Sequence, residues 1–160
     1  ALPDVIKEIK NVKYILAGKG DDVGRIKQLV KDLKIEDYVV MPGYVLEEEL
    51  VNYYNLCDVF VMPSKGEGFG FVFLEALACG KPVIAGNQDG SVDAVLGGKV
   101  GILVNPDSID EIANAIISIL SSNVDKKLID SDFLIKSVNG IYGINKFKEK
   151  VKNFIYGLQK

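Results

Sequence analysis

The hydrophobic pattern of the chain alternates between two kinds of segment. Short, continuously apolar runs predict buried strands at 12–18, 38–43, 58–64, 81–86 and 100–106. Between these runs, apolar residues recur every three or four positions, which predicts helices at 23–34, 46–57, 70–80, 91–98 and 108–122. Only helical patterns follow, over 124–160. We therefore predict an α/β fold, a doubly wound parallel sheet covered by helices on both faces, in a single domain spanning 1–160.

This architecture also predicts where a ligand binds. In doubly wound sheets the ligand lies outside the carboxyl ends of the strands, near a switch in strand order. The segments that directly follow the predicted strands are therefore the candidate binding segments: 18–20, 43–45, 64–70, 86–91 and 105–106.

Composition and charge exclude several kinds of function. A net charge of −3 gives no general attraction for nucleic acid, so no nucleic-acid partner is expected. The chain has no histidine, which excludes Ser-His-Asp and Cys-His catalysis within it and disfavours a zinc site. Cys57 and Cys79 lack metal-site or disulfide spacing, and no signal peptide is visible, so we expect a reducing, cytoplasmic location.

The segment "SKGEGFGFVFLEALACGKPV" (64–83) carries the candidate chemistry. Its strand-loop-helix order points the amides of a glycine-rich loop, and of the first helical turn, at the ligand crevice, where they favour phosphate. The carboxylates of Glu67 and Glu75 could accept hydrogen bonds from sugar hydroxyls. Alternatively, both are ordinary surface charges. Because residues 71–79 are otherwise apolar or small, we expect Glu75 to be buried and to need a ligand or a polar network.

The stretch "EGFGFVFLE" (67–75) resembles the E-x7-E motif of retaining glycosyltransferases of the GT-B fold, the group 1 or family-four class. The resemblance extends over roughly residues 10–122, through "PGYVLEEELVNYYNLCDVFVMPS" upstream and "GILVNPDSIDEIANAI" downstream. It implies a Rossmann-like domain that forms one half of a GT-B enzyme, the C-terminal half that binds the nucleotide-sugar donor.

The resemblance also implies roles for individual residues. Glu67 would contact hydroxyls of the donor sugar and serve as the catalytic-site carboxylate, and Glu75 would hold the ribose of the nucleotide. The base would lie near Tyr44 and Val45. The loop and helix amides that would receive the pyrophosphate or sugar belong to Gly68, Phe69, Gly70, Phe71 and Val72. Gly18 and Gly20 resemble a glycine turn beside the nucleoside, although a turn without ligand contact explains them equally well. No metal or other cofactor is strictly required by enzymes of this class.

The chain departs from the family pattern before its first residue. A "GR…KG" segment that binds the phosphates would precede residue 1, and so would the acceptor-binding domain. The chain then resembles an isolated donor-binding half, which we expect to be inactive alone. For the full-length enzyme we expect a saccharide or lipid acceptor. We expect it to lie in the cytoplasm or peripherally at the inner membrane. The terminal helix, 144–159, would cross to the other domain with an apolar stripe, or pack on this domain's own core. The stripe comprises Phe147, Val151, Phe154 and Ile155.

The resemblance favours a UDP-hexose as the donor, and two other functions compete with that of a glycosyltransferase. A non-catalytic nucleotide-binding module could share the fold, and what precedes Ala1 in the gene would distinguish it. A Rossmann dehydrogenase is disfavoured by the glycine spacing. After Gly18 and Gly20, the G-x-G-x-x-G motif requires its third glycine at position 23, but the chain has it at Gly24.

Overall fold

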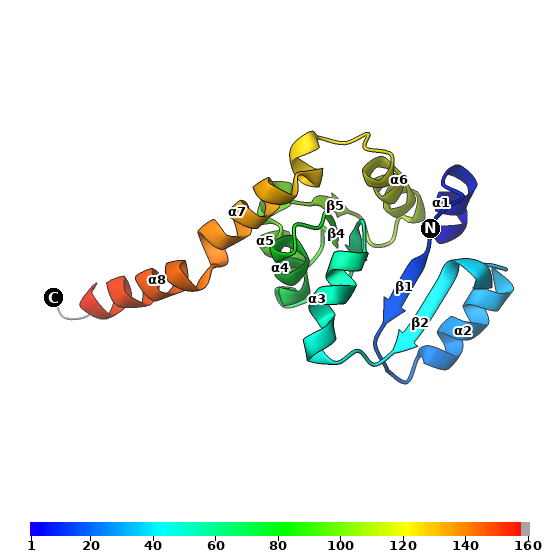
Figure 1. Cartoon of the computed structure of the whole chain (residues 1–160), viewed down its shortest axis with the longest axis horizontal. Helices are drawn as coiled ribbons and strands as arrows, with labels where there is room; N and C mark the ends of the chain where they lie inside the picture. Colours follow the sequence, from blue (N-terminus) through cyan, green and yellow to red (C-terminus); the bar gives the residue numbers. More distant parts are fainter. Residues whose placement is uncertain (158–160) are drawn as a thin grey trace.

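The computed structural model describes residues 1–157, in which every predicted strand and helix is present (Figure 1). The strands are shorter than the apolar runs: β1 (Tyr14–Ala17), β2 (Val39–Gly43), β3 (Phe60–Met62), β4 (Val83–Gly86) and β5 (Ile102–Val104). The α-helices are α1 (Leu2–Glu8), α2 (Val23–Asp32), α3 (Glu47–Leu56), α4 (Phe71–Ala78), α5 (Ser91–Ala94), α6 (Ile109–Leu120), α7 (Ser131–Tyr142) and α8 (Ile144–Gly157). Single 3-10 turns are η1 (Glu36–Tyr38), η2 (Leu96–Gly98) and η3 (Lys126–Ile129).

All strand pairs are parallel, as the alternation of strands and helices predicts. β1 pairs with β2, while β4 lies between β3 and β5. The hydrogen bonds thus form two ladders instead of one continuous sheet. A ladder continues only where a neighbouring strand lies about 4.8 Å away, and within residues 1–157 β1 pairs only with β2 and β3 only with β4.

The core is built around β4, whose residues are all buried. Because side chains alternate along a strand, Val83 and Ala85 face one side and Ile84 faces the other. Helices α4, α5 and α7 cover the first face through Phe73, Leu77, Ala94, Leu134 and neighbouring apolar residues. Helix α6 covers the second face through Ala115 and Ile119. This three-layer arrangement confirms the prediction of an α/β fold with helices on both faces.

Helix α7 belongs to this core, whereas α8 does not. Leu134 and Val138 of α7 are buried against α4 and its neighbours, and the Ser131 hydroxyl donates to the Gly80 carbonyl oxygen. Helix α8 continues away from the body of the molecule (Figure 1) and has no buried residue. The alternative that the terminal helix packs on this domain's own core is therefore wrong for the residues described; residues 158–160 lie outside them.

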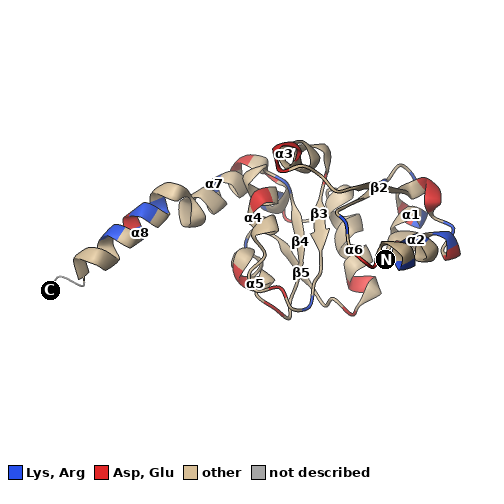
Figure 2. Cartoon of the chain, turned by 90° about the horizontal axis from the view of Figure 1, so that it is seen from below, with Lys and Arg blue, Asp and Glu red and all other residues tan. Residues whose placement is uncertain are grey.

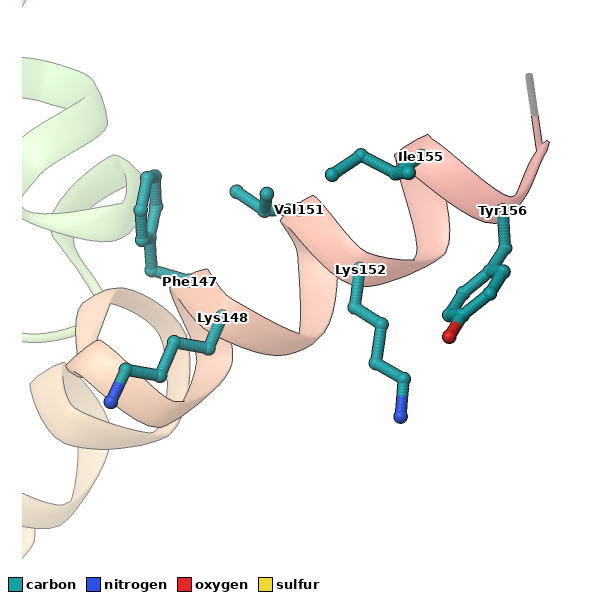
Figure 3. A pocket seen from close by; sticks show the side chains of 6 residues that line it. All are labelled: Phe147, Lys148, Val151, Lys152, Ile155 and Tyr156. Carbon is teal, nitrogen blue, oxygen red and sulfur yellow. The ribbon is translucent and has the colours of Figure 1, made fainter. Parts of the chain in front are cut away.

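The exposed helix α8 is amphipathic. Phe147, Val151 and Ile155 lie along one side of it and line an open hollow of about 330 Å3 together with Lys148, Lys152 and Tyr156 (Figure 3). Figure 2 shows that lysines gather on α8, whereas the first turn of α3 is acidic. The apolar stripe, with side chains 39–68% exposed, is thus uncovered by the described residues. Its contact with an acceptor-binding domain stays a prediction.

The central strand gives a direct test of the core. Ile84→Ala should lower the free energy of unfolding by about 2–5 kcal/mol, because Ile84 is fully buried and truncation leaves a cavity. The same change at Ile109, which is 59% exposed, should cost about 0.5 kcal/mol or less. Urea unfolding measures both, and equal losses would contradict the assignment of β4 as the centre of the core.

Candidate functional site

The loop from β3 to α4 requires glycine at two positions. Gly66 and Gly70 have φ values of 117° and 86°, in the region that favours glycine. Gly70 also precedes the first turn of α4, and a Cβ atom there would lie 2.5 Å from the Phe73 ring. The loop can therefore approach both the helix and a ligand closely, and it presents Glu67 half-exposed at its tip.

The start of α4 has the character of an anion site. The first amides of a helix have no partner within it, and the helix dipole adds a partial positive charge. Here the Phe73 amide donates back to the Gly70 carbonyl oxygen, whereas Phe71 and Val72 occupy the first two helical positions. Phe69 and Phe71 pack edge to face beside this end of the helix. Of the amides that the resemblance assigns to the pyrophosphate or sugar, those of Phe71 and Val72 thus lie in the first turn of α4.

Glu75 lies on the outer side of α4, so the expectation that it is buried is wrong. Phe73, Ala76 and Leu77 turn the apolar face of α4 to the core, and residue 75 points about 200° away from residue 73 around the helix. The exposed Glu75 side chain lines an open hollow of about 250 Å3 between α4 and α7. The apolar residues around it in sequence include Phe71 and Ala78, which are exposed too.

The expected polar partner of Glu75 is present, and it is a tyrosine of α3. The Tyr54 hydroxyl donates to Glu75 Oε2 over 2.7 Å, although the Tyr54 ring is 9% exposed and packs edge to face on Phe60. Burial, reinforced by the hydrogen bond to the Glu75 carboxylate, holds the pKa of Tyr54 well above its ordinary value. Tyr54 therefore stays a neutral donor that fixes one oxygen of Glu75.

A second group of predicted residues comes together at the ends of β1 and β2. The Gly18 amide donates to the Gly43 carbonyl oxygen, and Lys19 Nζ lies 4.7 Å from the centre of the Tyr44 ring. Tyr44 is 62% exposed, whereas Val45 is buried and could offer a ligand only its backbone. Within the described residues, no hydrogen bond or aromatic contact joins this group to the β3–α4 loop.

The connection between β4 and α5 holds the glycine loop, a role that the sequence did not reveal. The Gly90 amide donates to the Glu67 carbonyl oxygen, and the Asp89 carboxylate accepts the amides of Gly66 and Glu67. A Cβ atom at Gly90 would collide with the Gly68 carbonyl oxygen. The segment "NQDGS" (87–91) predicts a local turn, but contacts with residues more than 20 positions away leave no signal in it.

Other chemistry finds little support in the part of the chain that is described. No group of three or more His, Cys, Asp or Glu side chains there could hold a metal ion. Cys57 and Cys79 are free, and burial raises the pKa of both thiols, which disfavours a nucleophilic thiolate. No helix within residues 1–157 combines the length and the apolar character needed to cross a bilayer.

Comparison with known proteins identifies the family. The family model described as "Glycosyl transferases group 1" matches residues 1–131. The chain therefore belongs to the group 1 glycosyltransferases, which confirms the resemblance carried by the E-x7-E segment.

One relative is the GDP-mannose-dependent alpha-(1-6)-phosphatidylinositol monomannoside mannosyltransferase of Mycobacterium tuberculosis. It is 35% identical over 127 residues, which cover 75% of this chain and 33% of the relative. The chain thus spans about a third of the length of the curated relatives that it matches first.

Solved structures agree on the fold. The sucrose-phosphate synthase of Thermosynechococcus elongatus superposes with a TM-score of 0.81 at 28% identity, over 98% of this chain and 41% of that protein. HepE of Anabaena, solved in complex with UDP, gives a TM-score of 0.79 at 24% identity, over 98% of this chain and 44% of HepE. The chain has the Rossmann-like α/β fold of one half of a GT-B glycosyltransferase.

Introducing an alanine at Gly90 tests the close approach of the β3–α4 loop and the β4–α5 connection. Gly90→Ala should lower the free energy of unfolding by about 1–3 kcal/mol, because its Cβ collides with backbone that cannot rotate away. Gly24→Ala, in helix α2 with open space around it, should be neutral or stabilise by up to about 1 kcal/mol. Urea unfolding measures both, and a neutral Gly90→Ala would contradict the observed contact.

The bond between Tyr54 and Glu75 predicts a pH dependence. Tyr54→Phe should cost about 1–2 kcal/mol of unfolding free energy near neutral pH, because a hydrogen bond to a carboxylate is lost. Since folding raises the pKa of Tyr54, its contribution is complete below an unfolded pKa of about 10 and is lost as pH rises beyond it. The difference in unfolding free energy between wild type and Tyr54→Phe should therefore become smaller above about pH 10. Chemical unfolding at several pH values measures it.

Tyr53, the half-buried tyrosine beside it, provides the control. Tyr53→Phe should change the unfolding free energy by about 0.5 kcal/mol or less near neutral pH. If the difference in unfolding free energy between wild type and Tyr54→Phe stayed constant from pH 7 to pH 11, the proposed link between Tyr54 ionisation and its hydrogen bond to Glu75 would be wrong.

Proposed function

We propose that the full-length protein transfers a sugar, with retention of configuration, from a nucleoside diphosphate donor to an acceptor hydroxyl, and that residues 1–157 bind the donor. One observation gives this proposal its main support. The half-exposed Glu67 lies beside the start of α4, since a Cβ atom at Gly70 would lie 3.2 Å from Glu67 Cγ, so a carboxylate and the first amides of the helix are close together. A sugar diphosphate presents hydroxyls and negative charge at matching positions.

The diphosphate is bound at the start of α4 in this proposal. The amides of Phe71 and Val72, with the helix dipole, stabilise the charge that develops on the departing diphosphate. Further cations are expected from the "GR…KG" segment of the family. Lys65, the cation within the loop itself, already forms an ion pair with Asp107.

Glu67 and Glu75 hold the two sugar rings of the donor. Glu67 accepts hydrogen bonds from the transferred sugar, and Glu75 accepts hydrogen bonds from the ribose. The Tyr54 hydroxyl occupies only Oε2 of Glu75, and the side chain is exposed, so its other acceptor sites remain accessible. The base is placed near Tyr44, whose exposed ring offers a stacking surface.

The reaction is proposed as a same-face displacement through an oxocarbenium-like transition state. The bond between the anomeric carbon and the diphosphate oxygen breaks, and the acceptor oxygen bonds to that carbon from the same side. The departing phosphate takes the acceptor proton, so no histidine of this chain is needed. Glu67 orients the sugar and stabilises its developing positive charge, and it does not act as a covalent nucleophile.

The donor is proposed to be a UDP-hexose. HepE binds UDP in its solved complex, which supports this choice, whereas the mycobacterial relative is named for GDP-mannose. The acceptor is proposed to be a saccharide or a lipid, held by a second domain, and the M. tuberculosis enzyme named above acts on a phosphatidylinositol mannoside. A cytoplasmic location is part of the same proposal.

Two substitutions test the assignment in the full-length protein. Glu67→Ala and Glu75→Ala should each weaken donor binding about tenfold or more, since each removes hydrogen bonds to a charged acceptor. Isothermal calorimetry with UDP-, GDP- and ADP-sugars measures the affinities and identifies the base, and turnover is measured in parallel. Glu48→Ala, an exposed carboxylate of α3, is the control. Unchanged affinity and turnover in both variants would refute these roles, and nucleotide binding without any turnover would favour a non-catalytic module.

A further inference from the structure

Asp89 is surrounded by hydrogen-bond donors from two segments of the chain. Its Oδ2 atom accepts the Ser64 hydroxyl at 3.0 Å and the amides of Gly66 and Glu67, each at 2.9 Å. Its Oδ1 atom accepts the Ser91 amide at 2.9 Å. Both carboxylate oxygens are therefore engaged by the protein, and the half-buried side chain faces the glycine loop.

The backbone of Glu67 is held on both sides by the same connection. The Asp89 carboxylate binds the Glu67 amide, and the Gly90 amide binds the Glu67 carbonyl oxygen at 2.9 Å. No bond within the loop itself fixes both groups in this way. Because the backbone direction at residue 67 sets where its side chain points, Asp89 determines where the Glu67 carboxylate can reach.

Asp89 is ionised in the folded protein. Burial opposes its ionisation, but the Ser91 side chain and three backbone amides outweigh that effect, so the pKa of Asp89 lies well below its usual value. A charged acceptor binds amides more strongly than a neutral one, which suits a side chain that must order a glycine-rich loop.

We propose that Asp89 is a positioning residue for donor binding, which orders residues 64–67 so that Glu67 meets the transferred sugar. The inference rests on the proposed role of Glu67. A loop with glycines at 66, 68 and 70 has many accessible backbone states, and ordering it during binding would weaken the affinity. Asp89 holds the loop in one state before the donor arrives.

The test uses the full-length protein with Asp89→Ala, Asp89→Asn and a matched control. Asp130→Ala is the control, because Asp130 also accepts a backbone amide, that of Phe133, and caps α7 away from the glycine loop. Hydrogen exchange of the Gly66 and Glu67 amides reports the loop directly. Donor KM and kcat report function, and unfolding midpoints report overall stability.

For Asp89→Ala we expect exchange at Gly66 and Glu67 to rise at least tenfold and kcat/KM to fall about tenfold or more. Asp89→Asn keeps an acceptor oxygen, so it should recover part of the protection from exchange and part of kcat/KM. It replaces the alanine variant if that variant does not fold. Asp130→Ala should lower the unfolding midpoint but leave loop exchange and kcat/KM unchanged. An equal fall in kcat/KM for Asp130→Ala would show that lost stability is the cause, and would overturn the proposal.

A double-mutant cycle separates this inference from the proposed function. If Asp89 acts through Glu67, Asp89→Ala combined with Glu67→Ala should reduce kcat/KM no further than Glu67→Ala alone. If Glu67→Ala reduces kcat/KM and the two losses multiply, the positioning role is wrong and the role of Glu67 stands. If Glu67→Ala leaves kcat/KM unchanged, both proposals fall.

Discussion

The parallel pairing of β3 with β4 is the constraint on which the candidate site depends. Met62 lies opposite Ala85 in this pair. Because the two strands run in the same direction, the segments that follow them leave the sheet at the same edge. Ser64 and Asp89 follow within a few residues and come within hydrogen-bond distance, although 25 positions separate them in sequence. An antiparallel pair would send these two segments to opposite edges, and the loop that bears Glu67 would have no support.

Helix α4 serves the core and the candidate site with different faces. Phe73 and Leu77 are fully buried and pack the helix against β4, which holds its amino end in place relative to the sheet. Glu75 projects from the opposite face, where Tyr54 of α3 holds it. The rigidity that the proposed diphosphate site needs is thus a consequence of core packing, and the glycines of the loop lie in the segment where we propose that the ligand binds.

Periodicity was enough to predict every strand and the helices from α2 onward, because burial on one or both faces leaves a local pattern. It failed where the outcome depended on neighbours. Glu75 was expected to be buried because the residues around it are apolar, yet the phase of the helix turns it outward with Phe71 and Ala78. Asp89 was missed because its partners, Gly66 and Glu67, are distant in sequence. The division into two ladders depends on strand order, which the sequence does not encode locally.

The exposed stripe of helix α8 supports the proposal that this chain forms part of a larger active site. Its apolar stripe includes Phe147 and Phe154, which are 60% and 68% exposed, and burying such side chains on a partner would release about 1.5–3 kcal/mol each. The described residues give them no partner. The M. tuberculosis relative is more than twice as long as this chain, so a second domain that supplies the acceptor site could also supply this cover. The same contact would then fix the geometry between donor and acceptor, which the proposed same-face transfer requires.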